Sequence, residues 1–118
     1  MATAEKKNMD KPDETRKFEK GKVEILNLPG GTVGRYHFEP GWKWSEHVKP
    51  IAGTDLCQAE HHTYQISGRI HIRMADGTEF EQGPGDVAII PAGHDGWVVG
   101  NEPCTGVDWA GMANYAKK

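Results

Sequence analysis

The sequence predicts an all-β fold, a barrel or jelly roll of about nine or ten short strands. Its 118 residues include 15 glycines and seven prolines, which separate many short apolar runs. No segment repeats apolar residues with the 3.6-residue period of an amphipathic helix. We expect a single domain, because this length is typical of one domain and sufficient for a hydrophobic core.

The first twenty residues differ in composition from the rest of the chain. They carry eleven charges, and their few apolar side chains include Met9 and Phe18. Such a composition is typical of a solvated segment. We therefore divide the chain into a charged N-terminal arm, residues 1–20, and a barrel domain, residues 21–118. We expect the arm to lie on a second subunit of a homodimer.

Predicted strands and turns alternate after the arm. Residues 23–26 and 33–38 predict two strands separated by a turn at Pro29-Gly30-Gly31, and residues 42–47 alternate like a third. Residues 50–59 predict a loop, and residues 111–118 a single helical turn. The remaining predicted strands are residues 61–67, 70–74, 78–81, 86–90, 97–99 and 105–109, with a hairpin turn at Asp76-Gly77.

Two histidines follow turns in a similar way. The turns Pro84-Gly85 and Pro91-Ala92-Gly93 enclose an apolar strand and lead directly to His94, and the turn Pro40-Gly41 leads to His47. Histidines placed after turns on neighbouring strands can meet at the mouth of a barrel. Neutral imidazole is a good ligand for several divalent metals.

These turns and histidines resemble the two sequence motifs of the cupin superfamily, in particular its small single-domain conserved-barrel members. The resemblance covers residues 22–110 and implies a single cupin β-barrel, or jelly roll. His94 lies two positions before the histidine of the second motif and shares its face of the strand. The matching residues are Gly41, His47, His61 and Gly68 in the first motif and Gly85, Pro91 and Gly93 in the second.

The resemblance implies that His47, His61 and His94 hold one divalent metal ion per chain, either zinc, iron, manganese or nickel. A second register, counted back from His61, places the other two ligand positions of the first motif at Asp55 and Cys57. A Cys57 thiolate would favour zinc. Otherwise Cys57 is a small buried apolar residue.

Three further residues are assigned to the site as secondary positions. Gln65 shares a strand face with His61, so it either lines the cavity as a hydrogen-bonding group or is a paired interior amide. His62 adjoins His61, so the two face opposite sides of the strand, and the motif spacing favours His61 inside. Lys49 occupies the position of a second motif histidine, where it either binds an anionic substrate group or is solvated.

Composition also limits the partners and the location. The formal net charge is −3 and no basic patch stands out, so we expect neither nucleic acid nor a membrane surface as a partner. The longest aliphatic run, Val87–Ile90, is too short to span a membrane. The N-terminus lacks the apolar core of a signal peptide. Cys57 and Cys104 fit free thiols in a reducing compartment. We therefore expect a cytoplasmic protein.

Three hypotheses for the function follow. The first is a metal-dependent enzyme, a dioxygenase or isomerase, that acts on a small organic molecule through the Lewis acidity of the metal. The second is a non-catalytic ligand-binding or sensory cupin. The third is a structural dimer whose site has lost its function. A tightly held metal with open coordination positions favours the first hypothesis, and a closed apolar pocket without metal favours the others.

Overall fold

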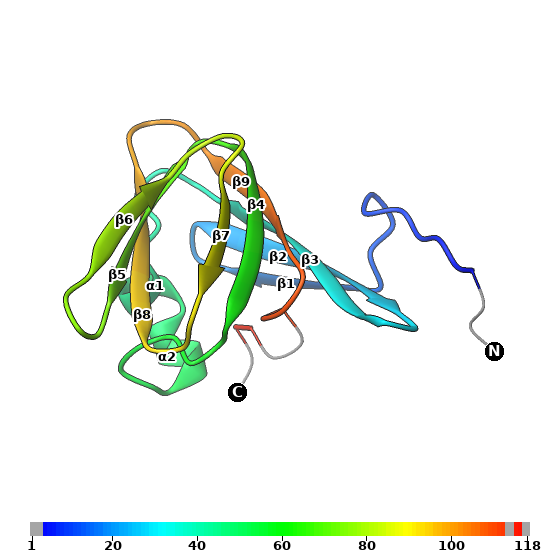
Figure 1. Cartoon of the computed structure of the whole chain (residues 1–118), viewed down its shortest axis with the longest axis horizontal. Helices are drawn as coiled ribbons and strands as arrows, with labels where there is room; N and C mark the ends of the chain where they lie inside the picture. Colours follow the sequence, from blue (N-terminus) through cyan, green and yellow to red (C-terminus); the bar gives the residue numbers. More distant parts are fainter. Residues whose placement is uncertain (1–3, 113–114, 117–118) are drawn as a thin grey trace.

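The computed structural model describes residues 4–112 and residues 115 and 116. Nine strands in this part of the chain form two antiparallel sheets, one of six strands in the order β1-β2-β3-β9-β4-β7 and one of three in the order β6-β5-β8 (Figure 1). The strands are β1 (Glu14–Phe18), β2 (Gly21–Leu28), β3 (Gly31–Phe38), β4 (His61–Ser67), β5 (Arg69–Met74), β6 (Glu79–Gln82), β7 (Val87–Ile90), β8 (His94–Val99) and β9 (Cys104–Asp108).

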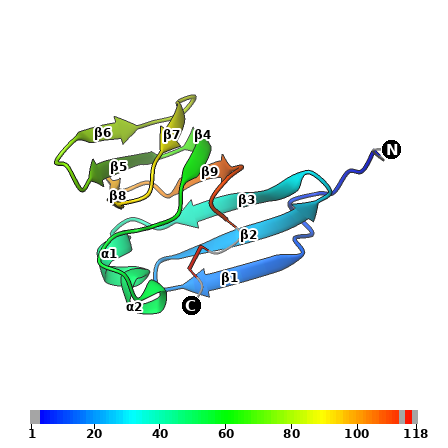
Figure 2. The same cartoon turned by 60° about the horizontal axis from the view of Figure 1, so that its bottom comes forward.

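The two sheets form the jelly roll that the sequence predicts. In Figure 2 the three-stranded sheet lies beside one part of the larger sheet, and the long strands β2 and β3 extend beyond it. Burial alternates along the strands that bound the interior, as in β8 and β9, because successive side chains point to opposite faces. The core contains Val23, Ile25, Tyr36, Phe38, Trp42, Trp44, Val48, Ile70, Ile72, Ile90 and Val98.

Part of the predicted N-terminal arm belongs to the sheet. Glu14–Phe18 forms β1, which pairs with β2 so that Arg16 lies opposite Val23. The Phe18 ring packs against that of Phe38, with centroids 6.1 Å apart. Charged residues outnumber apolar ones because β1 is an edge strand, and charge on an edge strand discourages pairing with other chains. Composition alone therefore did not distinguish the edge strand at residues 14–18 from the rest of the charged segment.

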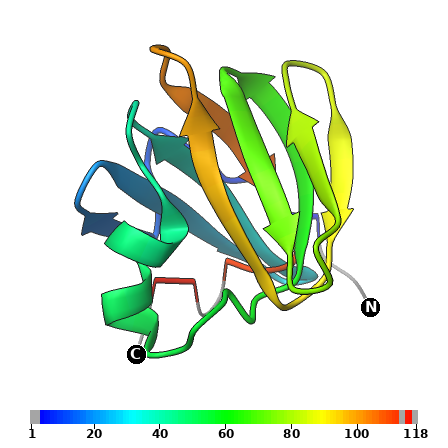
Figure 3. The ribbon, with the colours of Figure 1, turned by 90° about the vertical axis from the view of Figure 1, so that its left-hand side faces the viewer.

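The strand predicted over residues 42–47 is wrong. The structure has a short helix there, α1 (Trp44–His47), and a second, α2 (Lys49–Ala52), covers the start of the segment predicted as a loop over residues 50–59. The two helices lie one above the other beside the barrel (Figure 3). Trp44 and Val48 are both buried, and their spacing of four residues suits one face of a helical turn. Over six residues, alternation with period two did not distinguish a strand from a helix.

The ends of the second helix and of a hairpin follow familiar turn chemistry. Gly53 ends α2 in the left-handed conformation, with φ of 77°. The hairpin predicted at Asp76-Gly77 joins β5 to β6, and there Thr78 N–H donates to Asp76 Oδ1 over 2.9 Å. The helical turn predicted over residues 111–118 lies partly outside the described residues. None of the helices in the described ranges is long and apolar enough to cross a membrane.

Candidate metal centre

Backbone hydrogen bonds bring Cys57 and His94 together, although they are far apart in sequence. Cys57 lies in the segment after α2, and His94 begins β8. The Cys57 N–H donates to the His94 carbonyl over 2.8 Å, and the Gly93 N–H donates to the Cys57 carbonyl over 2.7 Å. This bridge holds the loop that carries the cysteine against the start of the strand that carries the histidine.

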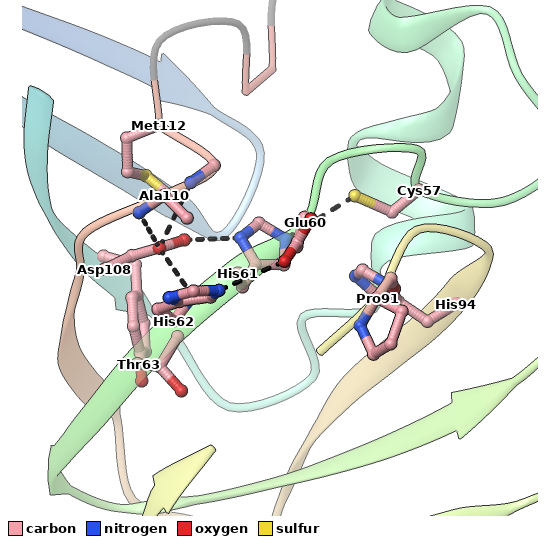
Figure 4. A network of polar contacts seen from close by, with 12 residues as sticks. Cys57, Glu60, His61, His62, Thr63, Pro91, His94, Asp108, Ala110 and Met112 are labelled. Atoms are coloured by element: carbon pink, nitrogen blue, oxygen red, sulfur yellow. Dashed lines mark hydrogen bonds and ion pairs between the residues drawn. The ribbon is translucent and has the colours of Figure 1, made fainter. Parts of the chain in front are cut away.

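His61 completes a cluster of three buried metal-ligating side chains. It begins β4 and lies opposite Ile90 of β7. Cys57, His61 and His94 each offer a ligand atom within 4.8 Å of the others. Figure 4 shows polar contacts running from Asp108 through His61 to Cys57, with His94 near the cysteine. At most 7% of any of these three residues is exposed.

The distances and donor types fit a zinc-sized ion. Cys57 Sγ lies 3.7 Å from His61 Nε2. In a tetrahedral zinc complex, a sulfur at about 2.3 Å and a nitrogen at about 2.0–2.1 Å from the metal lie about 3.6 Å apart. A set of one thiolate and two imidazoles leaves a fourth position for water or substrate, as in catalytic zinc sites.

Outer hydrogen bonds orient both imidazole rings. The Asp108 carboxylate pairs with His61 Nδ1, and the Pro91 carbonyl lies 2.8 Å from His94 Nδ1. When Nδ1–H donates to these oxygens, Nε2 of each ring is left as a lone-pair donor. Carboxylate or carbonyl partners of this kind fix the tautomer of metal-ligating histidines and increase their basicity.

Asp108 is fully buried and connects the site to the C-terminal segment. Its Oδ1 accepts the backbone N–H groups of His62, Ala110 and Gly111 at 3.2, 2.9 and 3.2 Å. Burial would raise the pKa of Asp108, but the contact with His61 and the backbone hydrogen bonds outweigh burial and lower this pKa. Gly111 lies so close to the His61 ring that a Cβ there would collide with the imidazole and the Glu60 carbonyl.

Without a bound metal, the side chains of Cys57 and His61 carry opposite charges. Burial would raise the pKa of Cys57, but hydrogen bonds and charge interactions with His61 and His94 outweigh it and lower this pKa to about 6. Burial would lower the pKa of His61, but Asp108 and Cys57 raise it to about 9. Near pH 7 the metal-free site therefore holds a thiolate beside an imidazolium, and a metal ion that binds must displace the proton of His61.

An apolar cavity of about 50 Å³ adjoins the cluster inside the barrel. His61 and His94 lie in its wall, together with aromatic and aliphatic side chains such as Phe38, Trp42 and Ile72. A larger groove is lined in part by Cys57. Trp44 and Tyr115 line both spaces, so the ligand atoms lie where the apolar cavity and this groove adjoin.

The structure does not bring His47 into this cluster. His47 ends α1, where its Nδ1 lies 3.0 Å from the Lys43 backbone N–H and its Nε2 3.9 Å from a Glu19 carboxylate oxygen. The sequence interpretation required a strand here, and the helix turns the side chain toward its own first turn instead. Cys57 stands with the two other histidines, as in the second register.

The secondary positions divide between surface and interior. Lys49 and Asp55 form an exposed ion pair of 3.4 Å outside the cluster. His62 faces outward and His61 inward, as alternation requires. Gln65 is fully buried as a paired amide, and its Oε1 accepts the Tyr36 hydroxyl over 2.6 Å.

Sequence reasoning missed Asp108. Its signal was its place on the strand predicted at residues 105–109, since Cys104, Gly106 and Asp108 share the inward face of β9. An acidic residue at an inward position must be paired, and a buried histidine is its natural partner.

The fold recurs among solved structures of low sequence identity. No protein-family model and no curated protein matches the sequence. A structure of unknown function from Rhizobium leguminosarum matches with a TM-score of 0.68 and 17% identity, over 92% of this chain and 97% of that one. The polyketide cyclase RemF from Streptomyces resistomycificus matches with a TM-score of 0.63 and 18% identity, over 92% of this chain and 80% of that one.

A larger enzyme also contains this fold. Oxalate decarboxylase from Bacillus subtilis, described with Mn(II) centres, matches with a TM-score of 0.58 and 24% identity over 88% of this chain. The chain spans 28% of that decarboxylase, and 32% of another from Lactobacillus farciminis. Taken with the two antiparallel sheets and the turn motifs, these similarities show that the chain is a small protein of the cupin fold.

Proposed function

We propose that the chain is a metal-binding cupin that uses Cys57, His61 and His94 as ligands and receives a small molecule in the adjoining cavity. The observation that supports this proposal is the convergence of three buried ligand atoms within 4.8 Å. The outer partners of both histidines strengthen it, because they present Nε2 in the form a metal requires.

The metal in this proposal is zinc. A thiolate ligand selects zinc over the harder manganese that an oxygen-rich site prefers. The Mn(II) centres belong to the Bacillus decarboxylase, and this chain has a cysteine among its candidate ligands. A bound zinc ion would supply Lewis acidity toward a substrate oxygen.

The protein side chains would then orient the metal and the substrate. Asp108 holds the His61 ring in place and favours its protonated form when the metal is absent. The apolar wall excludes water, which strengthens electrostatic interactions inside the cavity. These features favour isomerase-like chemistry at a polarised oxygen over simple storage of a ligand. With the same ligands and no turnover, the chain would be a sensory or ligand-binding cupin.

Substitution by Co²⁺ tests the proposal, because cobalt bound to a thiolate gives a charge-transfer absorption band that imidazole ligands alone do not give. We expect this band in the wild-type protein and its loss in Cys57→Ser. Cys104→Ser is the matched control, since Cys104 is equally buried but lies in a different part of the interior. A band that survives in Cys57→Ser, or no uptake of Co²⁺ or Zn²⁺ by folded wild-type protein, would contradict the proposal.

A second candidate function is thiol catalysis, which is favoured by the alignment of Cys57, His61 and Asp108. The thiolate, the imidazole and the carboxylate follow one another as in a nucleophile–base–acid triad. This function does not need His94 as a ligand. Zinc uptake that protects Cys57 from alkylation, and that depends on His94, would favour the metal centre over the triad.

We also propose that the chain is a cytoplasmic homodimer. Both cysteines are free, which fits a reducing compartment. Large apolar side chains are exposed on β4 and β7, where Val87 and Ile89 are 75% and 66% exposed. Strand β7 is also an edge of the larger sheet. Light scattering should return about twice the 13.0 kDa mass of one chain, and Ile89→Lys should return that of a monomer.

A further inference from the structure

One face of β1 contacts residues near the other end of the chain. Arg16 and Phe18 are two positions apart on this strand, so their side chains point to the same side. Arg16 Nη1 donates to the backbone carbonyls of Met112 and Tyr115 over 3.0 and 2.6 Å. The Phe18 ring lies edge-on to the Tyr115 ring, with centroids 6.4 Å apart. The first strand and the C-terminal segment therefore hold one another, and Figure 2 shows them side by side.

The Arg16 guanidinium is itself held in place by a second partner. Its Nε and Nη2 donate to the two carboxylate oxygens of Glu14 over 2.6 and 3.1 Å. Only 11% of the Arg16 side chain is exposed. The two-pronged ion pair leaves both hydrogens of Nη1 for the two carbonyls. A lysine could not reproduce this arrangement, because its donors all lie on one nitrogen.

Tyr115 connects this anchor to the proposed metal ligands. Only 5% of Tyr115 is exposed, and its ring meets the His61 imidazole edge-on with centroids 5.6 Å apart. Tyr115 lines the apolar cavity and also the larger groove, whose wall includes Cys57. It therefore forms part of the wall where these two spaces adjoin.

Met112 and Asp108 fix the same segment at two other points. Met112 is 2% exposed, and it packs so closely on Gly34 of β3 that a Cβ there would collide with it. The Asp108 carboxylate pairs with His61 and accepts backbone N–H groups of the residues that follow it. The contacts of Arg16 with the Met112 and Tyr115 carbonyls complete this set of anchors.

We infer that Arg16 is a positioning residue for the cluster of Cys57, His61 and His94. By holding the Tyr115 carbonyl, it keeps the tyrosine ring against the His61 imidazole and limits access to Cys57 from the groove. The inference rests on the proposed function for what the cluster binds, whereas the contacts of Arg16 are made without a metal. A residue from the charged first part of the chain thereby serves the site of its own barrel.

Alkylation of the metal-free protein by iodoacetamide tests the inference, with both cysteines followed in one sample by peptide mass spectrometry. Arg16→Gln removes the charged donor, so Cys57 should react at least about tenfold faster than in the wild-type protein. Cys104, which accepts a hydrogen bond from Gln65 over 2.8 Å in another part of the interior, should keep its rate. An equal rise at both cysteines would show that Arg16 stabilises the whole fold without positioning the site. That result, or an unchanged rate at Cys57, would overturn the inference.

Arg35→Gln is the matched control, because Arg35 lies in the same sheet and its guanidinium pairs with Glu24 and Asp10. It should leave the Cys57 rate unchanged, and a rise as large as in Arg16→Gln would overturn the inference. If Arg16→Gln does not fold, Arg16→Lys replaces it, since lysine keeps the charge and loses the two-pronged geometry. The Cys57 rate should again rise selectively, and a wild-type rate would contradict the role of the guanidinium.

Tyr115→Leu tests whether Arg16 acts through the tyrosine ring. This variant should raise the Cys57 rate at least as much as Arg16→Gln, and combining the two should have little further effect. Effects that multiply in the double variant would contradict an action through Tyr115. The wild-type protein should also show an NMR cross-peak between the Tyr115 ring and the His61 imidazole. Arg16→Gln should weaken this cross-peak, and Arg35→Gln should preserve it.

Zinc release separates this inference from the proposed function. In zinc-loaded protein, Arg16→Gln should lose Zn²⁺ to excess EDTA at least about tenfold faster than the wild type, as expected for a residue that orients a ligand. A wild-type chain that takes up no zinc would contradict the proposed function, whereas a selective rise at Cys57 would still support the role of Arg16. Zinc uptake without that rise would contradict the role of Arg16 alone.

Discussion

Cys57 and Cys104 are both buried in the same barrel, yet their thiols lie in opposite surroundings. At most 3% of either residue is exposed. Cys57 faces two imidazole rings, and their hydrogen bonds overcome burial and lower its pKa to about 6. Cys104 faces the Gln65 amide, and burial raises its pKa to about 11. Burial alone therefore does not determine the state of a thiol, and a cationic partner reverses its effect.

The largest expected difference between the two cysteines is their reactivity toward iodoacetamide. In metal-free protein at pH 7.5, Cys57 should react at least about tenfold faster than Cys104, because its far larger thiolate fraction outweighs the lower nucleophilicity of a low-pKa thiolate. The rate at Cys57 should rise through about pH 6 and level off above it. Mass spectrometry of the single-thiol variants Cys57→Ser and Cys104→Ser measures each rate separately. Equal alkylation rates would contradict the expectation that the two thiols have different pKa values.

The next largest effect is expected for metal affinity, which should distinguish the cluster around Cys57 from other parts of the molecule. Removing a ligand by His94→Ala should weaken Zn²⁺ binding by at least about a hundredfold, because the two remaining ligands hold the ion poorly. His47→Ala is the matched control, since this histidine is the last residue of α1, has a largely buried side chain and lies outside the cluster. Competition with a chromophoric chelator gives both affinities. A loss of zinc in His47→Ala that equals the loss in His94→Ala would mean that the ligand set is wrong.

Asp108→Asn tests a residue that contacts a proposed ligand, His61, without being a proposed ligand itself. The amide keeps the shape of the carboxylate and removes its charge, so zinc binding should weaken by about tenfold to a hundredfold. The same variant should lower the pKa of His61, because Asp108 raises it in the wild-type protein. NMR titration of the metal-free imidazole measures this second effect. An unchanged titration would show that the carboxylate serves only to hold the backbone of residues 110 and 111.

The smallest expected effect concerns alkaline stability. The pKa of Cys104 is raised on folding, so its contribution to stability is complete below the unfolded pKa near 9 and is lost as pH rises through about 11. Serine does not titrate in this range. The stability of the wild-type protein relative to Cys104→Ser should therefore fall by about 2 kcal/mol between pH 9 and pH 11. Urea unfolding of both proteins across this range measures the difference, and parallel curves would contradict it.

The fold could be predicted from the sequence because the turns that define it have recognisable sequences. The Pro-Gly turns before His47 and His94 have fixed spacing, and they specify the strand ends of a jelly roll directly. Alternation likewise required His61 and His62 to face opposite sides of their strand, and the motif spacing selected His61 as the inward residue, as the structure has it. These conclusions needed only local patterns along the chain.

The candidate site could be predicted only in part, because it depends on contacts across the chain. Cys57 reaches His94 through a backbone bridge that no local pattern encodes, so the sequence could offer it only as an alternative to His47. Asp108 acquires its role by pairing across the sheet, where it lies opposite Thr63 of β4. The four-residue helix α1 spans only about one helical turn, which is too short for helical periodicity to show in the sequence, and this is why His47 was placed on a strand.

Gly111 has a consequence for how this protein can evolve. Most invariant glycines are explained by backbone conformation, so asparagine is a tolerable substitute. Here the restriction is the space beside the His61 ring and the Glu60 carbonyl. Even the methyl group of alanine would collide with the imidazole. A residue such as asparagine, which tolerates the left-handed conformation, would collide in the same way, because the restriction is one of space. Deep mutational scanning should therefore find position 111 intolerant of every other residue, whereas Gly30, whose Cβ would meet open space, accepts many.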